Sequence, residues 1–166
     1  MPRLIRLVGA EMVDAADPFT AVDDDQPTPR GDVIITLARF EREGERLLAE
    51  GRAVGVRVAP DEDVELLAYD LPRIALVALA FPRFRDGRAY SAARILRERL
   101  GYKGEVRAVG DVLLEQAPFM IRCGFDAFEP ADAAGLEAWS AAAHRFRHVY
   151  QRAADGRVPA FAERGG

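Results

Sequence analysis

A chain of 166 residues with a net charge of −4 fits one globular domain whose core needs neither disulfide nor metal. The acidic balance argues against non-specific nucleic-acid binding, and the longest apolar run is too short to span a membrane. Cys123 is the only cysteine, which excludes an internal disulfide, a Cys-x-x-Cys pair and an all-cysteine iron–sulfur site within one chain.

Residues 1–30 are predicted to form a leader with an edge hairpin, followed by a loop or linker. Prolines and the run Asp23-Asp24-Asp25 mark the loop. The first eight residues contain arginines where a signal peptide needs an uninterrupted apolar core. We therefore expect a cytoplasmic protein.

Residues 31–150 are predicted to form a single α/β domain, followed by a polar tail at 151–166. Short β-branched runs alternate with helical patterns. Strands are expected at 33–37, 54–58, 74–81, 105–109 and 125–128, and helices at 40–51, 64–69, 92–100, 112–123 and 133–150. This pattern of about five mostly parallel strands fits an open doubly wound sheet or a partial β/α barrel, with the strand order left open.

The charge is unevenly distributed. Residues 1–70 hold 16 acidic and 8 basic side chains, whereas residues 83–107 hold 8 basic and 3 acidic ones. The basic block directly follows the apolar strand expected at 74–81. In open α/β sheets, ligands bind beyond the carboxyl ends of the strands, so the block predicts a small-anion site or a surface for an acidic protein partner.

The turn after this strand is the main candidate site. Ser91 is expected to cap a helix that begins at Ala92, and Gly101 to end that helix. Helix N–H groups and arginine forks both bind oxyanions. The predicted anion-binding residues are Arg83, Arg85, Gly87, Arg88, Ser91 and Arg94. The plainer alternative is that the arginines are solvated and Asp86 pairs with one of them.

The turn Gly110-Asp111 follows the next strand and would adjoin the arginine turn if the two strands are neighbours. Asp111 is predicted to cap a helix from Val112. The same carboxylate could instead orient Arg88 or serve as an acid or base, as could Asp86. Asp86 and Asp111 are therefore the catalytic candidates.

The histidines, the cysteine and Pro118 do not indicate a further functional site. His144 and His148 have a metal-compatible spacing, but no third ligand completes the set, so no metal is predicted. Cys123 is expected to be a packed, inert thiol, and Pro118 to kink a helix or to start a new helical turn. The chain lacks nucleotide-binding glycine motifs, so no cofactor is indicated, although a flavin without a motif stays open.

Three runs of sequence carry a family resemblance: Arg85-Asp-Gly-Arg-Ala-Tyr-Ser91, 96–112 (LRERLGYKGEVRAVGDV) and Arg122-Cys-Gly-Phe-Asp-Ala-Phe128. Over about residues 31–161 the chain resembles a bacterial family of uncharacterised proteins. Its members bear the label "probable oxidoreductase of sulfite reduction", and their genes tend to lie beside those for assimilatory sulfite reductase. Ala117-Pro118 departs from the family pattern, which has bulkier apolar residues there.

The resemblance adds Tyr90 to the expected anion-binding residues and adds Gly110, Gln116 and Arg122 as supporting site residues. It also suggests sulfite reductase or its electron donor as a partner. The first hypothesis is an accessory protein of assimilatory sulfite reduction. It would bind an anion (sulfite, a sulfate ester or a sirohaem carboxylate) or dock the reductase through the arginine turn. The alternatives are a small enzyme acting on an anionic metabolite with an aspartate acid/base, and an interaction module without a small ligand.

Overall fold

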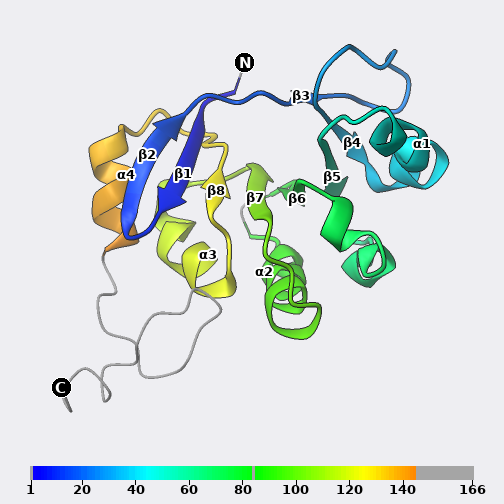
Figure 1. The fold of residues 1–166 in the computed structure, drawn as a ribbon. Helices are drawn as coiled ribbons and strands as arrows, with labels where there is room; N and C mark the ends of the chain where they lie inside the picture. Colours follow the sequence, from blue (N-terminus) through cyan, green and yellow to red (C-terminus); the bar gives the residue numbers. More distant parts are fainter. Residues whose placement is uncertain (1, 84, 145–166) are drawn as a thin grey trace.

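The computed structural model describes residues 2–83 and 85–144, which form one curled sheet with helices packed along it (Figure 1). The strands are β1 (Leu4–Val8), β2 (Glu11–Ala15), β3 (Thr20–Ala21), β4 (Val33–Thr36), β5 (Val54–Val58), β6 (Leu76–Phe81), β7 (Glu105–Gly110) and β8 (Ala127–Phe128). The helices are α1 (Leu37–Ala49), α2 (Arg88–Arg94), α3 (Ala117–Cys123) and α4 (Leu136–Ala143). Shorter helical turns are η1 (Val64–Leu67), η2 (Leu71–Arg73), η3 (Ile95–Arg99) and η4 (Leu114–Gln116).

The strand order is β2-β1-β8-β7-β6-β5-β4-β3. Strands β3 to β8 are parallel and lie side by side in chain order, whereas β1 is antiparallel to both β8 and β2. A doubly wound sheet needs a reversal of strand order, and the parallel strands have none. The predicted α/β class is confirmed. Of the two arrangements left open, the structure has the partial barrel.

The described sheet has eight strands where the sequence predicted about five. The five predicted strands are β4 to β8. The additional strands come from the N-terminal segment: β1 and β2 form a hairpin in which Leu4 pairs with Ala15, and β3 is a two-residue strand beside β4. The N-terminal hairpin extends one end of the sheet because Ile5 of β1 pairs with Phe128 of β8.

Helix α1 begins earlier than predicted because Thr36 caps it. The Thr36 hydroxyl accepts a hydrogen bond from the Arg39 N–H at 3.1 Å. Gly44 lies inside this helix and has a packing role. A Cβ at Gly44 would lie 2.6 Å from the ring of Phe40, so the glycine makes room for that ring on the buried face.

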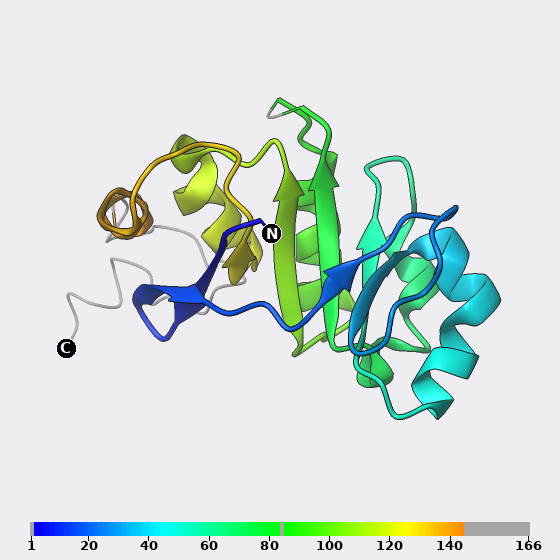
Figure 2. The same ribbon diagram turned by 90° about the horizontal axis from the view of Figure 1, so that it is seen from above.

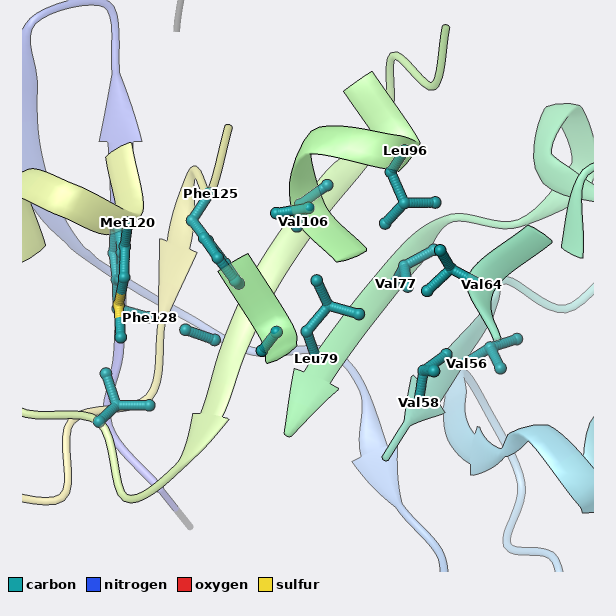
Figure 3. Packing of buried hydrophobic residues seen from close by; sticks show 14 of the residues in the cluster. Val56, Val58, Val64, Val77, Leu79, Leu96, Val106, Met120, Phe125 and Phe128 are labelled. Carbon is teal, nitrogen blue, oxygen red and sulfur yellow. The ribbon is translucent and has the colours of Figure 1, made fainter. Parts of the chain in front are cut away.

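One face of the sheet carries the main core under the helices (Figure 3). Val77 and Leu79 of β6 and Val106 of β7 point into it, and Leu96 meets them from the helical layer. All four residues are at most 1% exposed. Side chains alternate between faces along a strand, so the neighbours of these residues lie on the opposite face.

The opposite face is crossed by the segment between β2 and β3, which runs in front of β7 and β6 (Figure 2). Phe19 of this segment forms a smaller core with Ile34, Leu76 and Ala78. The same face holds Arg107, which is fully buried. The N-terminal segment therefore covers a face that the helices leave open.

Several predicted boundaries shift. The helix predicted at 92–100 is α2 followed by the π-helical turn η3, in which the Leu100 N–H donates to the Ile95 carbonyl. Gly101 has φ +65°, as expected for the residue that ends this helix. The segment predicted as one helix at 112–123 is η4 followed by α3, with Pro118 in the first turn of α3, which confirms the predicted new helical turn. Residues 145–150 of the last predicted helix and the tail at 151–166 lie outside the described residues.

Candidate functional site

The arginine turn leaves β6 at the carboxyl edge of the sheet. Arg83, Arg85 and Arg88 are all exposed. Arg88 is held by Asp86 through a 2.7 Å contact from Nη2 and a 3.1 Å contact from Nε. The pairing of Asp86 with one arginine was the plainer alternative at the sequence level, and it is present.

The carboxylate of Asp86 also begins helix α2. It accepts a 3.1 Å hydrogen bond from the Arg88 N–H, so the helix starts at Arg88 with Gly87 as its N-cap. The prediction that Ser91 caps a helix from Ala92 is wrong, because Ser91 lies inside α2 and is exposed. Gly87 has φ −83°, which any residue can adopt.

Hydrogen bonds from Arg88 lower the pKa of Asp86 below its ordinary value of 3.8. A carboxylate stabilised as its charged form is a weaker base. The geometry therefore supports Asp86 as a structural residue of the turn more than as a catalytic one.

The turn Gly110-Asp111 does adjoin the arginine turn, because β6 and β7 are neighbours. The Asp111 N–H donates to the Phe81 carbonyl at 2.7 Å. Gly110 has φ +94°, and a Cβ there would lie 2.4 Å from the same carbonyl oxygen. Gly110 and Asp111 thus hold the carboxyl end of β7 against the carboxyl end of β6.

The expected cap by Asp111 is wrong, since Asp132 takes that role. Its Oδ2 accepts a 2.7 Å hydrogen bond from the Leu114 N–H, at the first residue of η4. Gln116 acts locally as well, because its side-chain oxygen accepts from the Leu113 N–H at 3.2 Å. A residue 18 positions away in sequence can replace a local cap only once the chain has folded.

A hollow of about 510 Å³ lies between helices α2 and α3, which pack side by side (Figure 1). It is lined by Tyr90, Arg94, Phe119, Arg122 and Cys123. We call it the α2–α3 cavity. Three predicted site residues meet there: Tyr90 and Arg94 from α2, and Arg122 from α3. None of the other predicted site residues that the structure describes is among the lining residues.

The two arginines of the cavity differ in their partners. Arg94 donates from Nη1 to Glu98 at 3.2 Å, one helical turn along the chain. The Nε of Arg122 is buried, and it has no hydrogen-bond partner among the described residues. A buried N–H without an acceptor costs about 1–3 kcal/mol. Arg122 thus borders the cavity with a guanidinium group whose Nε forms no hydrogen bond among the described residues.

Burial sets the protonation of the remaining polar groups. It raises the pKa of Tyr90 to about 12, so the phenol stays protonated at neutral pH. Burial also raises the pKa of the Cys123 thiol, an effect that the neighbouring Arg94 partly opposes. The cavity thus presents two cations, a phenol donor and an uncharged thiol. The thiol is buried, as predicted from the sequence.

Phe119 and Cys123 were not predicted as site residues. Their spacing held a usable signal: residues four apart share a helix face. Tyr90 and Arg94 share a face of α2, and Phe119 and Cys123 share a face of α3. What the sequence could not supply was the contact between those two faces.

The part of the chain that contains the cavity matches a known protein family. A family model described as "Bacterial protein of unknown function (DUF934)" matches residues 55–161, well over half of the chain. The chain belongs to this family. All five cavity residues fall within the DUF934 region, whereas β1 to β4 and α1 precede it. No curated protein matches the chain.

Two further observations concern the described residues of this DUF934 protein. Among residues 2–83 and 85–144, no group of three or more His, Cys, Asp or Glu side chains is arranged to hold a metal. His144 is described and exposed, with a 2.7 Å contact from Nδ1 to the Ser140 carbonyl, whereas His148 lies outside the described residues. Within the same ranges, no helix has the length and hydropathy needed to cross a membrane.

Proposed function

We propose that the protein is an accessory protein of assimilatory sulfite reduction that binds a small anion in the α2–α3 cavity. The observation that carries the proposal is that Arg94 and Arg122 border the same hollow. An anionic group in the hollow would interact with both guanidinium groups.

The proposed anion site therefore lies between helices α2 and α3 and not at the arginine turn that precedes α2. The turn arginines are exposed, while Arg94 and Arg122 border a hollow with a largely apolar lining. Charge interactions are stronger in such a space than in bulk water. The same anion-binding chemistry is retained with a different set of residues.

The sulfite-reduction role is supported by the sequence resemblance set out above. An accessory role fits the chain better than self-contained redox chemistry, because the sequence holds one cysteine and no nucleotide-binding glycine motif. Flavin and sirohaem stay open as ligands, and the sirohaem carboxylates match the arginine chemistry of the cavity.

A second candidate is docking to sulfite reductase or its electron donor through the arginine turn. The observation that favours it is the exposure of Arg83, Arg85 and Arg88 on one connection. The Arg88–Asp86 pair orders part of this connection. An exposed basic loop fits an acidic protein surface better than it fits a buried ligand.

Growth complementation separates the two candidates. In a bacterium lacking its own copy of the gene, growth on sulfate as the only sulfur source is measured with variants of this chain. The double variant Arg94→Gln, Arg122→Gln should fail to restore growth, and full restoration would reject the cavity proposal. Arg99→Gln is the matched control, because Arg99 is exposed and pairs with Glu65.

The docking candidate has its own variant. If Arg85→Ala with Arg88→Ala fails to support growth while retaining its melting temperature, docking through the turn gains support. If this variant grows normally, the docking candidate is rejected and the cavity proposal is unaffected.

A further inference from the structure

The α2–α3 cavity is larger and less polar than an inorganic oxyanion needs. Its volume of about 510 Å³ lies in the range of pockets that hold organic ligands of drug size. Three of its five described lining side chains are the rings of Tyr90 and Phe119 and the thiol of Cys123. Sulfite or sulfate would contact the arginines and leave these walls uncovered.

We infer that the ligand is an organic monoanion with a planar, apolar body and one carboxylate or sulfonate group. This inference rests on the proposed function, because it names the ligand class of the same cavity. The acidic group lies against Arg94 and Arg122, and the planar body lies against the two aromatic rings.

The charges favour a single negative group. Arg94 is already paired with Glu98 at 3.2 Å. The buried Nε of Arg122, in contrast, has no carboxylate or other acceptor among the described residues. Among the described residues, the local balance is therefore one positive charge, which a monoanion neutralises and a dianion exceeds.

The aromatic wall on α2 packs against two other rings. The Tyr90 ring packs edge-on against Phe81, with centroids 5.4 Å apart, and against Phe125, with centroids 6.4 Å apart. Phe81 and Phe125 are at most 1% exposed. A wall held in this way loses little entropy when a planar ligand packs on it.

The aromatic wall on α3 is only half covered. Phe119 is 50% exposed, although its helix neighbour Met120 is fully buried. A planar ligand in the cavity would cover part of the exposed Phe119 ring, and aromatic pairs of this kind gain free energy beyond simple burial. The buried thiol of Cys123 adds a soft, uncharged wall between the rings and the arginines.

The test is titration calorimetry of the full chain at pH 7 with three probes. The probes are 2-naphthoate, the neutral 2-naphthamide of nearly the same shape, and inorganic sulfite. We expect 2-naphthoate to bind at least tenfold more tightly than either other probe. Arg122→Gln should weaken 2-naphthoate at least tenfold, while the control Arg99→Gln should leave its affinity unchanged.

The outcomes separate this inference from the proposed function. If sulfite binds with a requirement for Arg122 and 2-naphthoate does not, the ligand class is wrong and the proposed anion site stands. If neither anion binds, or if 2-naphthamide binds as tightly as 2-naphthoate and Arg122→Gln changes nothing, both are overturned. If Arg122→Gln fails to fold, Arg122→Lys takes its place. Lysine keeps the positive charge but lacks the planar guanidinium group, so Arg122→Lys should also weaken the binding of 2-naphthoate.

Discussion

Arg107 and Asp17 are 90 residues apart in sequence, yet their side chains form a 2.8 Å ion pair across the face of the sheet that the helices leave uncovered. Arg107 is fully buried and also donates to Glu105 at 2.7 Å. Its guanidinium lies 5.9 Å from the ring centre of Phe19, in the same N-terminal segment as Asp17. One buried cation thereby fixes the crossing segment to β7.

The first prediction concerns this ion pair. Asp17→Ala should lower the free energy of unfolding by about 3 kcal/mol, because it removes a partner from a buried charge. Urea denaturation measures the loss. The control is Asp14→Ala, whose pair with Arg3 is largely exposed and should contribute at most about 1 kcal/mol. Equal effects of the two substitutions would contradict a structural role for the crossing segment.

The second prediction concerns the pH dependence of stability through Glu129. Burial raises the pKa of Glu129 above its ordinary value of 4.5, and nearby Arg107 opposes only part of that effect. At a pH between the ordinary pKa and the raised pKa, Glu129 is ionised in the unfolded chain but protonated in the folded chain. The free energy of unfolding therefore falls as the pH rises above about 4.5. Glu129→Gln cannot ionise and should gain stability relative to the natural chain between pH 4 and pH 7.

The measurement for Glu129 is urea denaturation of both chains at several pH values. At pH 4 the difference between them should be smallest, since the natural side chain is then mostly protonated. Parallel stability curves across the whole range would show that Glu129 is not perturbed by burial.

The third prediction concerns the reactivity of Cys123. Because this is the only cysteine in the chain, alkylation by iodoacetamide reports on it alone. Burial raises the pKa of the thiol above its ordinary value of 9.0, so the folded protein should react slowly at pH 7.5 and the urea-unfolded protein much faster. A midpoint of the rate against pH below 9.0 in the folded protein would contradict the assignment of an inert thiol.

The strands were predictable because their signals are local. The apolar run at 74–81 and the β-branched run at 54–58 became β6 and β5 with small or no shifts. Strand order was not predictable, since nothing in a single strand states which neighbour it pairs with. The start of α2 was missed for a related reason: the carboxylate of Asp86 accepts the Arg88 N–H and begins the helix before Ser91.

Part of the candidate site could be named from the sequence, but its position in the fold could not. Tyr90, Arg94 and Arg122 were named from the sequence, and the structure brings them to one cavity. The expected centre at Arg83, Arg85 and Arg88 proved to be exposed. Whether an arginine borders a hollow or faces water depends on how α2 packs against α3, which is a tertiary contact without a local sequence signal.

The fourth prediction compares two glycines at the carboxyl edge of the sheet. Gly110 has φ +94°, and a Cβ there would lie 2.4 Å from the Phe81 carbonyl oxygen. Gly87 has φ −83°, and a Cβ there would meet no atom within 4 Å. Gly110→Ala should therefore cost about 2 kcal/mol or more, from the left-handed backbone and the clash with a carbonyl that cannot move away.

Gly87→Ala should change stability by less than about 1 kcal/mol, and a gain is expected if the unfolded chain loses freedom. Thermal and urea denaturation of the two variants give the comparison directly. Because Gly110 joins the end of β7 to the end of β6, the Gly110→Ala variant should also loosen the neighbouring turn, seen as faster amide exchange at Asp111, whose N–H donates to Phe81. Unchanged exchange at Asp111 together with full stability would show that this edge tolerates a side chain and that the glycine is not required by the closure of the two strands.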